Sequence, residues 1–154
     1  MSSFVIRAAA ERDLDALAEF EVTIAKVSFE DEAVTDLAVH RGKLEKALVR
    51  DPDTLWVAAT ADGDRVVGWL WLASNTNFLT QQRYANLRSL AVSADADTEV
   101  IGEALLRKAM DYARDHGLTE ITGKVHVDNY GMRMLYRRVG LEPVHLTMRM
   151  RLEP

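Results

Sequence analysis

The order in which strand-like and helix-like patterns follow one another most constrains the fold of this chain. Short runs rich in valine, leucine and tryptophan alternate with longer segments whose apolar residues recur every three or four positions. The mixture of hairpins and strand–helix–strand crossovers predicts one domain of the α/β or α+β class, with a mixed central sheet of about six to seven strands flanked by about four helices. The predicted strands are 4–7, 55–60, 65–73, 84–93, 120–127 and 145–152, and the predicted helices are 11–27, the segment between Thr35 and Asp51, 98–116 and 129–139.

Local signals mark where several of these elements turn or end. Asp62-Gly63 between two strand-like runs predicts a tight hairpin. Thr35 is the predicted N-cap of the second helix. Gly117 and Gly140 are placed to end the last two helices. These signals fix the order of the elements before any long-range contact is known.

Length and composition limit the classes of protein to which this chain can belong. The 154 residues suit a single domain spanning residues 1–154, and 48% hydrophobic with 28% charged residues is typical of a globular protein. Because there is no cysteine, disulfide scaffolds, thiolate zinc sites and cysteine nucleophiles are excluded. The four histidines have no paired spacing, so no metal site is predicted. The apolar run 66–73 is too short for a bilayer, and no signal peptide is recognisable, so we expect a cytoplasmic protein without a membrane partner.

The charges are unevenly distributed along the chain. Nineteen basic and 24 acidic residues give a net charge of −5, and residues 1–36 alone hold nine acidic and three basic residues. Such a chain lacks the basic surface that nucleic acid requires, so no nucleic-acid partner is expected. The acidic first quarter favours a cationic or amine-bearing partner, with a solvated helix face as the alternative.

The most specific motif lies at residues 125–141. It reads as a strand, then Asn129 opening a helix, then Leu135-Tyr136, then Gly140 before a further strand. Together with Leu90-Ala-Val92 and the helix start 102–106, this pattern resembles the GNAT superfamily of acetyltransferases. The resemblance covers most of the chain, because the order and lengths of the elements also match, and it implies a single domain of the α/β class.

The resemblance implies that acetyl-CoA is the co-substrate and where it binds. In GNAT proteins two strands splay apart, and the pantetheine arm bonds to the exposed backbone of one of them, here Leu90, Ala91 and Val92. A backbone N–H there also stabilises the oxyanion of the reacting thioester. Asn129 matches a residue that contacts the cofactor, and Tyr136 matches the tyrosine that protonates the leaving thiolate. From the residues alone, Asn129 could equally be an N-cap and Tyr136 a core tyrosine.

The expected pyrophosphate loop departs from the family pattern Gln/Arg-x-x-Gly-x-Gly/Ala. The aligned run is Asp97-Thr-Glu-Val-Ile-Gly102, in which only Gly102 agrees. Backbone N–H groups at a helix start bind phosphate whatever the side chains are, so the resemblance places Val100, Gly102 and Glu103 at the cofactor. The alternative is that Asp97 or Thr98 caps the helix and uses those N–H donors itself.

The acceptor side is predicted from the first two helices, which cover the acceptor in the family. Glu21 lies on the apolar stripe of the first helix, where a carboxylate could act as a base or reach water at the edge of the stripe. Phe29 and Glu30 are expected on a loop that borders a cationic acceptor. Trp71 is expected either to contact the acceptor or to pack the hairpin.

These features predict an acetyl-CoA-dependent N-acetyltransferase whose small amine-bearing acceptor attacks the thioester directly. One alternative keeps the fold but has lost or weakened acetyl-CoA use, and binds or transforms another small molecule in resistance or biosynthesis. A second is a protein-modifying acetyltransferase, which would have an open acceptor groove. A homodimer is compatible with the sequence.

Overall fold

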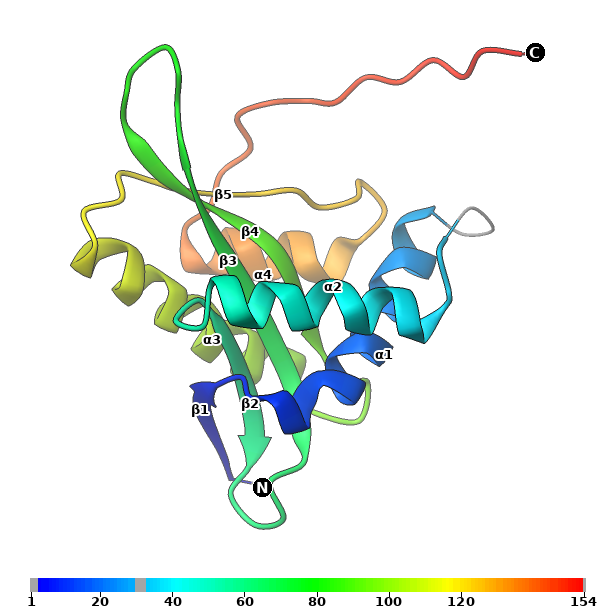
Figure 1. Ribbon diagram of the computed structural model, residues 1–154. Coiled ribbons are helices and arrows are strands. Elements are labelled where there is room, and N and C mark those ends of the chain that lie inside the picture. The colour runs from blue at the N-terminus through cyan, green and yellow to red at the C-terminus, as the bar shows by residue number, and fades with distance from the viewer. Residues whose placement is uncertain (1–2, 30–32, 154) are drawn as a thin grey trace.

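The computed structural model, which describes residues 3–29 and 33–153, is a twisted sheet with helices on both faces (Figure 1). The sheet has five strands in the order β1-β2-β3-β4-β5, antiparallel except for the parallel pair β4 and β5. The elements are β1 Phe4–Ala8, α1 Leu14–Phe29, α2 Leu37–Arg50, β2 Leu55–Thr60, β3 Val66–Thr76, β4 Arg83–Val92, α3 Thr98–Asp115, β5 Ile121–Gly123 and α4 Tyr130–Val139. The predicted α/β class is confirmed.

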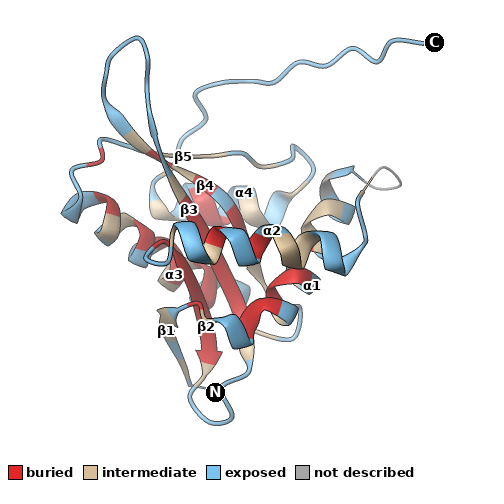
Figure 2. Ribbon diagram, in the orientation of Figure 1, coloured by how far each residue is buried: buried red, intermediate tan, exposed pale blue. Residues whose placement is uncertain are grey.

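Two apolar clusters hold the helices to opposite faces of the sheet. Strand side chains alternate between faces, so neighbouring residues of one strand enter different clusters. Trp69 and Trp71 pack with α1 and α2, whereas Leu70 and Leu72 pack with α3 and α4. Figure 2 shows the buried residues concentrated in the strands and on the inner sides of the helices. Within the described ranges, no helix is long and apolar enough to cross a membrane.

The turn and cap signals are mostly confirmed. The predicted hairpin joins β2 to β3, and Gly63 has a φ of +84°, which favours glycine. Gly140 ends α4 with a φ of +106°. The predicted cap at Thr35 is wrong by one residue, because the Asp36 side chain accepts a hydrogen bond from the Ala38 N–H at 2.9 Å. Asp and Thr are both good N-caps, so the sequence could not decide between these neighbours.

The predicted number of strands is too high. Of the predicted strand 120–127, only Ile121–Gly123 pairs in the sheet. The predicted strand 145–152 is wrong, because residues 142–153 extend away from the body without strand pairing (Figure 1). The alternating apolar side chains of this segment are 74–86% exposed: Val144, Leu146, Met148, Met150 and Leu152. A strand needs a hydrogen-bonding neighbour, and β5, the last strand of the sheet, offers only three paired residues.

Candidate active site

The site begins where β4 and β5 separate. Their parallel pairing ends at Leu87 and Gly123, but β4 continues to Val92 while staying paired to β3 on its other edge. The edge of residues 88–92 that faces β5 therefore has no strand partner within the described chain. Leu90, Ala91 and Val92 lie in this stretch, whose open backbone can hydrogen-bond a ligand. We call this place, where the two strands are no longer paired, the β4–β5 slot.

A β-bulge in β4 changes which way its side chains point beside the slot. Trp71 pairs with Ser89 and Leu72 pairs with Leu87, so Arg88 is an extra residue on β4. Both Arg88 and Ser89 consequently face α1 and α2. The Arg88 guanidinium carbon lies 4.6 Å from the centre of the Trp71 ring. The Ser89 hydroxyl donates a hydrogen bond to the buried Glu21 carboxylate.

Tyr136 lies on the other face of the sheet at the same place. Its ring packs near the point where the strands separate, since a Cβ added to Gly123 would lie 3.5 Å from Tyr136 Cε2 and 3.1 Å from Leu87 Cδ1. Only 8% of Tyr136 is exposed, and burial raises its pKa to about 12. In the described part of the chain its hydroxyl makes no hydrogen bond. Tyr136 thus stays protonated near neutral pH and can give a proton to a ligand.

Asn129 opens α4 as expected for a cap. Its side-chain oxygen accepts a hydrogen bond from the Met132 N–H at 3.2 Å. The side-chain NH₂ group makes no hydrogen bond to the rest of the described chain. Asn129 can therefore cap the helix and donate to a ligand at the same time.

At the start of α3, the capping alternative is the one observed. The Asp97 carboxylate accepts a hydrogen bond from the Val100 N–H at 3.1 Å, so one of the donors expected for phosphate is already used. Gly102 is buried, and a Cβ there would lie 2.5 Å from Leu135 Cδ2. This glycine therefore allows α3 and α4 to pack closely. The first-turn N–H groups of Thr98 and Glu99 make no hydrogen bonds within the described residues.

Arginines from the same helix and from distant parts of the chain partly neutralise this acidic loop. Arg138 of α4 contacts Glu99 at 2.7 Å, and Arg107 contacts Glu103 at 2.7 Å. Arg65 contacts Asp95 at 3.4 Å. These ion pairs are largely exposed, so each contributes little to stability, but together they weaken the repulsion of a polyanion that the loop sequence implies.

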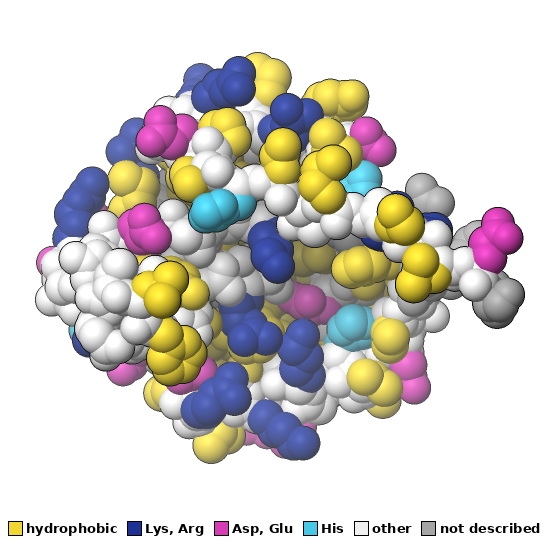
Figure 3. Space-filling view, turned by 90° about the horizontal axis from the view of Figure 1, so that it is seen from above, with side chains coloured by type: hydrophobic (Ala, Val, Ile, Leu, Met, Phe, Trp, Pro, Cys, Tyr) yellow, Lys and Arg dark blue, Asp and Glu magenta, His cyan; other side chains and the backbone are white. Residues whose placement is uncertain are grey.

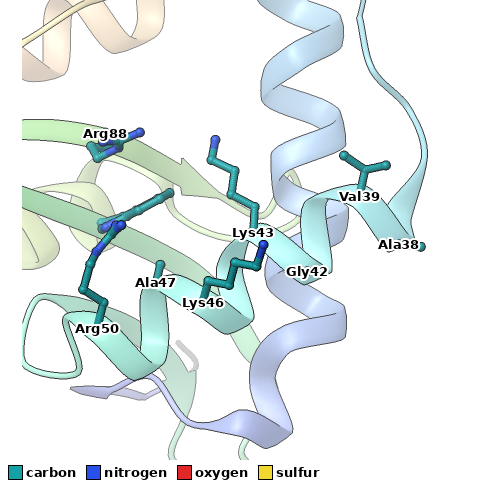
Figure 4. A pocket seen from close by; sticks show the side chains of 9 residues that line it. Ala38, Val39, Gly42, Lys43, Lys46, Ala47, Arg50 and Arg88 are labelled. Carbon is teal, nitrogen blue, oxygen red and sulfur yellow. The ribbon is translucent and has the colours of Figure 1, made fainter.

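A hollow of about 510 Å³ lies between α2 and the strands, and we call it the α2 hollow. Figure 3 shows a depression on this side of the molecule with Lys and Arg side chains along it, and Figure 4 shows Lys43, Lys46 and Arg50 from α2 with Arg88 from β4. Its lining residues are Ala38, Val39, Gly42, Lys43, Lys46, Ala47, Arg50, Trp71 and Arg88.

Of the predicted acceptor residues that the structure describes, only Trp71 lines the α2 hollow, and it is 2% exposed. Glu21 is buried against Ser89, and Phe29, at the end of α1, is 62% exposed and does not line the hollow. Glu30 lies outside the described residues.

The basic lining was not predicted from the sequence. Lys43, Lys46 and Arg50 are spaced by three and four positions, so one face of α2 carries all three. The basic face of α2 could have been recognised from that spacing. The position of Arg88 on the other side of the hollow could not, because it depends on the bulge in β4.

Comparison with known proteins identifies the family. The sequence profile of the Acetyltransferase (GNAT) family matches residues 14–141. The chain belongs to this family. This GNAT protein is also similar in fold to a probable acetyltransferase, with a TM-score of 0.77, 22% identity, and coverage of 99% of this chain and 97% of the other. An aminoglycoside 6′-N-acetyltransferase from Acinetobacter baumannii has a TM-score of 0.75, 13% identity, and 99% coverage of both chains. An acyltransferase enzyme is therefore supported.

Two curated relatives are mycothiol acetyltransferases. The protein from Rhodococcus opacus (strain B4) is 29% identical over 96 residues, and that from Rhodococcus jostii (strain RHA1) is 28% identical over 96 residues. Each match covers 62% of this GNAT chain but only 32% of the relative. The matched part thus spans about a third of the length of these curated relatives.

Proposed function

We propose that this GNAT protein transfers the acetyl group of acetyl-CoA to the amine of a small acceptor. The observation that carries the proposal is the β4–β5 slot, which has the Glu21 carboxylate on one face of the sheet and the Tyr136 hydroxyl on the other. A thioester lying between them would have a proton acceptor on the side of α1 and a proton donor on the side of α4. The curated relatives, named for acetyl transfer, support this type of reaction.

The residues around the slot suit each step of a direct transfer. The acceptor nitrogen attacks the thioester carbon, and the open N–H groups of residues 88–92 stabilise the developing oxyanion. When the C–S bond breaks, Tyr136 gives its proton to the CoA thiolate. Glu21 takes the proton that the amine loses, directly or through water, and exchange with solvent restores both groups.

The same arrangement supports roles for the remaining predicted cofactor residues. Leu90, Ala91 and Val92 offer their backbone to the pantetheine arm, and Asn129 offers its side-chain NH₂ group. At the pyrophosphate, the N–H groups of Thr98 and Glu99 are better placed as donors than Val100, whose N–H bonds to Asp97. The size of the α2 hollow suits a small acceptor better than a protein surface.

A second candidate function is favoured by the same cap at Asp97. Because this carboxylate uses one phosphate donor and adds negative charge, a GNAT protein that binds another small molecule without acetyl-CoA is the competing proposal.

Calorimetric titration with acetyl-CoA, together with an assay of CoA thiol release over a panel of amines, tests the two candidates. Binding with amine-dependent thiol release supports the proposed function. Thiol release without amine would indicate only hydrolysis. Lack of binding at millimolar acetyl-CoA would favour the second candidate.

A further inference from the structure

We propose that the α2 hollow binds an anionic group, phosphate or carboxylate, on the small amine that is acetylated. The proposal rests on the proposed function and specifies its acceptor class. It adds an anionic group to the amine-bearing partner that the acidic first quarter of the chain led us to expect.

The lining of the α2 hollow is strongly basic. Four of its nine described residues are basic and none is acidic. Arg50 has a carboxylate partner, Asp51 at 2.9 Å. Lys43, Lys46 and Arg88 have no carboxylate partner among the described residues. Three unpaired cations at one hollow of an acidic protein produce a local field that attracts anions.

Trp71 contacts two of these cations through its ring. Lys43 Nζ lies 5.5 Å and Arg88 Cζ lies 4.6 Å from the centre of its ring. The ring is almost completely buried, so it cannot move away from either charge. Each cation gains from the aromatic face, but the two charges repel each other. An anion bound by both would relieve that repulsion, and the planar guanidinium can hold a phosphate or carboxylate with two hydrogen bonds.

The position of Glu21 indicates in which direction the acceptor would lie, with its amine at one end and its anion at the other. Ser89, which donates to the Glu21 carboxylate, directly follows Arg88 on the bulged strand. A negative and a positive binding group are therefore adjacent along β4. A molecule with an amine at one end and an anion at the other matches both, with the amine toward Glu21 and the slot and the anion toward Lys43 and Arg88.

A neighbouring hollow provides space for the rest of such a molecule. It has a volume of about 420 Å³ and shares Arg50 and Arg88 with the α2 hollow. Its other lining residues include the polar side chains of Thr54, Ser74 and Asn75 and the carboxylates of Asp51 and Asp53, which lie away from Lys43 and Lys46 of the α2 hollow. The acceptor can therefore be larger than its two charged groups, with polar substituents.

The test compares matched amines with and without the anion. Calorimetry without acetyl-CoA measures binding of O-phosphoethanolamine against ethanolamine, and of 4-aminobutyrate against butylamine, at constant ionic strength. We expect at least one anionic probe to bind at least about tenfold more tightly than its neutral partner. The phosphate and carboxylate pairs show which anion is preferred.

Variants locate the binding. The double variant Lys43→Gln/Arg88→Gln should lose at least about tenfold in affinity for the preferred probe. The matched control Lys108→Gln/Arg114→Gln removes two exposed charges from α3, on the opposite face of the sheet, and should bind like the wild type. Thermal unfolding of both variants checks that the fold is retained.

The outcomes separate this inference from the proposed function. Equal binding of anionic and neutral probes, or an unchanged affinity in a folded Lys43→Gln/Arg88→Gln variant, would overturn the inference even if amines are acetylated. Anion binding that depends on both residues, without thiol release by any amine, would retain the anion site but overturn acetyl transfer. Tighter binding of a single-stranded decanucleotide RNA than of every small anion, lost in the same variant, would replace the small acceptor by a nucleic acid.

Discussion

Gly102 on α3 lies directly against the side chain of Leu135 on α4, so that an added Cβ would be 2.5 Å from Leu135 Cδ2. Leu135 is buried and immediately precedes Tyr136. The contact therefore sets how closely α4, and with it the proposed proton donor, approaches the rest of the domain.

Gly102→Ala should lower the free energy of unfolding by about 1–3 kcal/mol, because Leu135 must move to make room in a packed interface. Urea denaturation measures this change. Gly131→Ala on α4 is the control, since a Cβ there meets nothing within 4 Å, and it should raise the free energy of unfolding by about 0.5–1 kcal/mol. Unchanged stability in Gly102→Ala would show that α3 and α4 are not tightly packed at this point.

Tyr136→Phe should reduce turnover by about 10²–10⁴-fold, because the hydroxyl that protonates the thiolate is removed while the ring stays. Acetyl-CoA affinity and thermal stability should change little. Steady-state kinetics under conditions where chemistry limits the rate, together with calorimetry, test this expectation. Wild-type turnover would leave Tyr136 as a packing residue only.

The pH dependence of stability should also report Tyr136. Its pKa is raised by burial from 10.0 to about 12, so the folded state keeps a proton that the unfolded state releases. The resulting stabilisation is complete below pH 10 and is lost as the pH rises toward 12, by about 1.4 kcal/mol per pH unit. Denaturation across this range should give a shallower decline for Tyr136→Phe than for the wild type. Parallel declines would contradict the burial of the hydroxyl.

Asp97→Asn should tighten acetyl-CoA binding and reduce its sensitivity to salt. Asparagine caps a helix as well as aspartate does, so α3 should be retained while one negative charge near the phosphates disappears. Calorimetry at two salt concentrations makes the comparison, with Asp111→Asn farther along α3 as the charge-matched control. An equal effect of both substitutions would assign the gain to net charge alone.

Gly42→Leu should block the α2 hollow without harming the fold. A Cβ at Gly42 meets nothing within 4 Å, and leucine is a better helix former than glycine. We expect KM for the acceptor to rise, acetyl-CoA affinity to stay unchanged, and stability to increase slightly. Gly42→Ala, which adds a single methyl group, separates the helix effect from the blockage. An acceptor KM that is unaffected by leucine would place the acceptor elsewhere.

Features with local causes were predictable from the sequence. The hairpin at Asp62-Gly63 and the helix ends at Asn129 and Gly140 depend on the residue itself and a few neighbours, and all three are confirmed. The strand predicted at 145–152 had the right alternation, but alternation cannot supply a neighbouring strand. Pattern alone was therefore insufficient at the edge of the sheet.

The candidate site was less predictable because its geometry depends on distant contacts. Nothing local marks Arg88 as an extra residue, since the bulge is defined by pairing with Trp71 and Leu72. Gly102 fitted a phosphate-loop pattern, but its environment is set by Leu135, 33 positions later. The sequence did indicate Tyr136 and Trp71, and their roles in binding or chemistry stay predictions.

The short pairing between β5 and β4 determines which part of the fold can unfold locally. Three residue pairs tie this strand to β4, and α4 is held largely by its packing on α3 through Leu135. Asn129 and Tyr136 are thus carried by a unit with few backbone bonds to the sheet, whereas Glu21 and Arg88 belong to the extensively paired and packed remainder. Detachment of β5 and α4 would separate the two sides of the slot while leaving β1 to β4 intact, so the local stability of this unit limits how long the complete site persists.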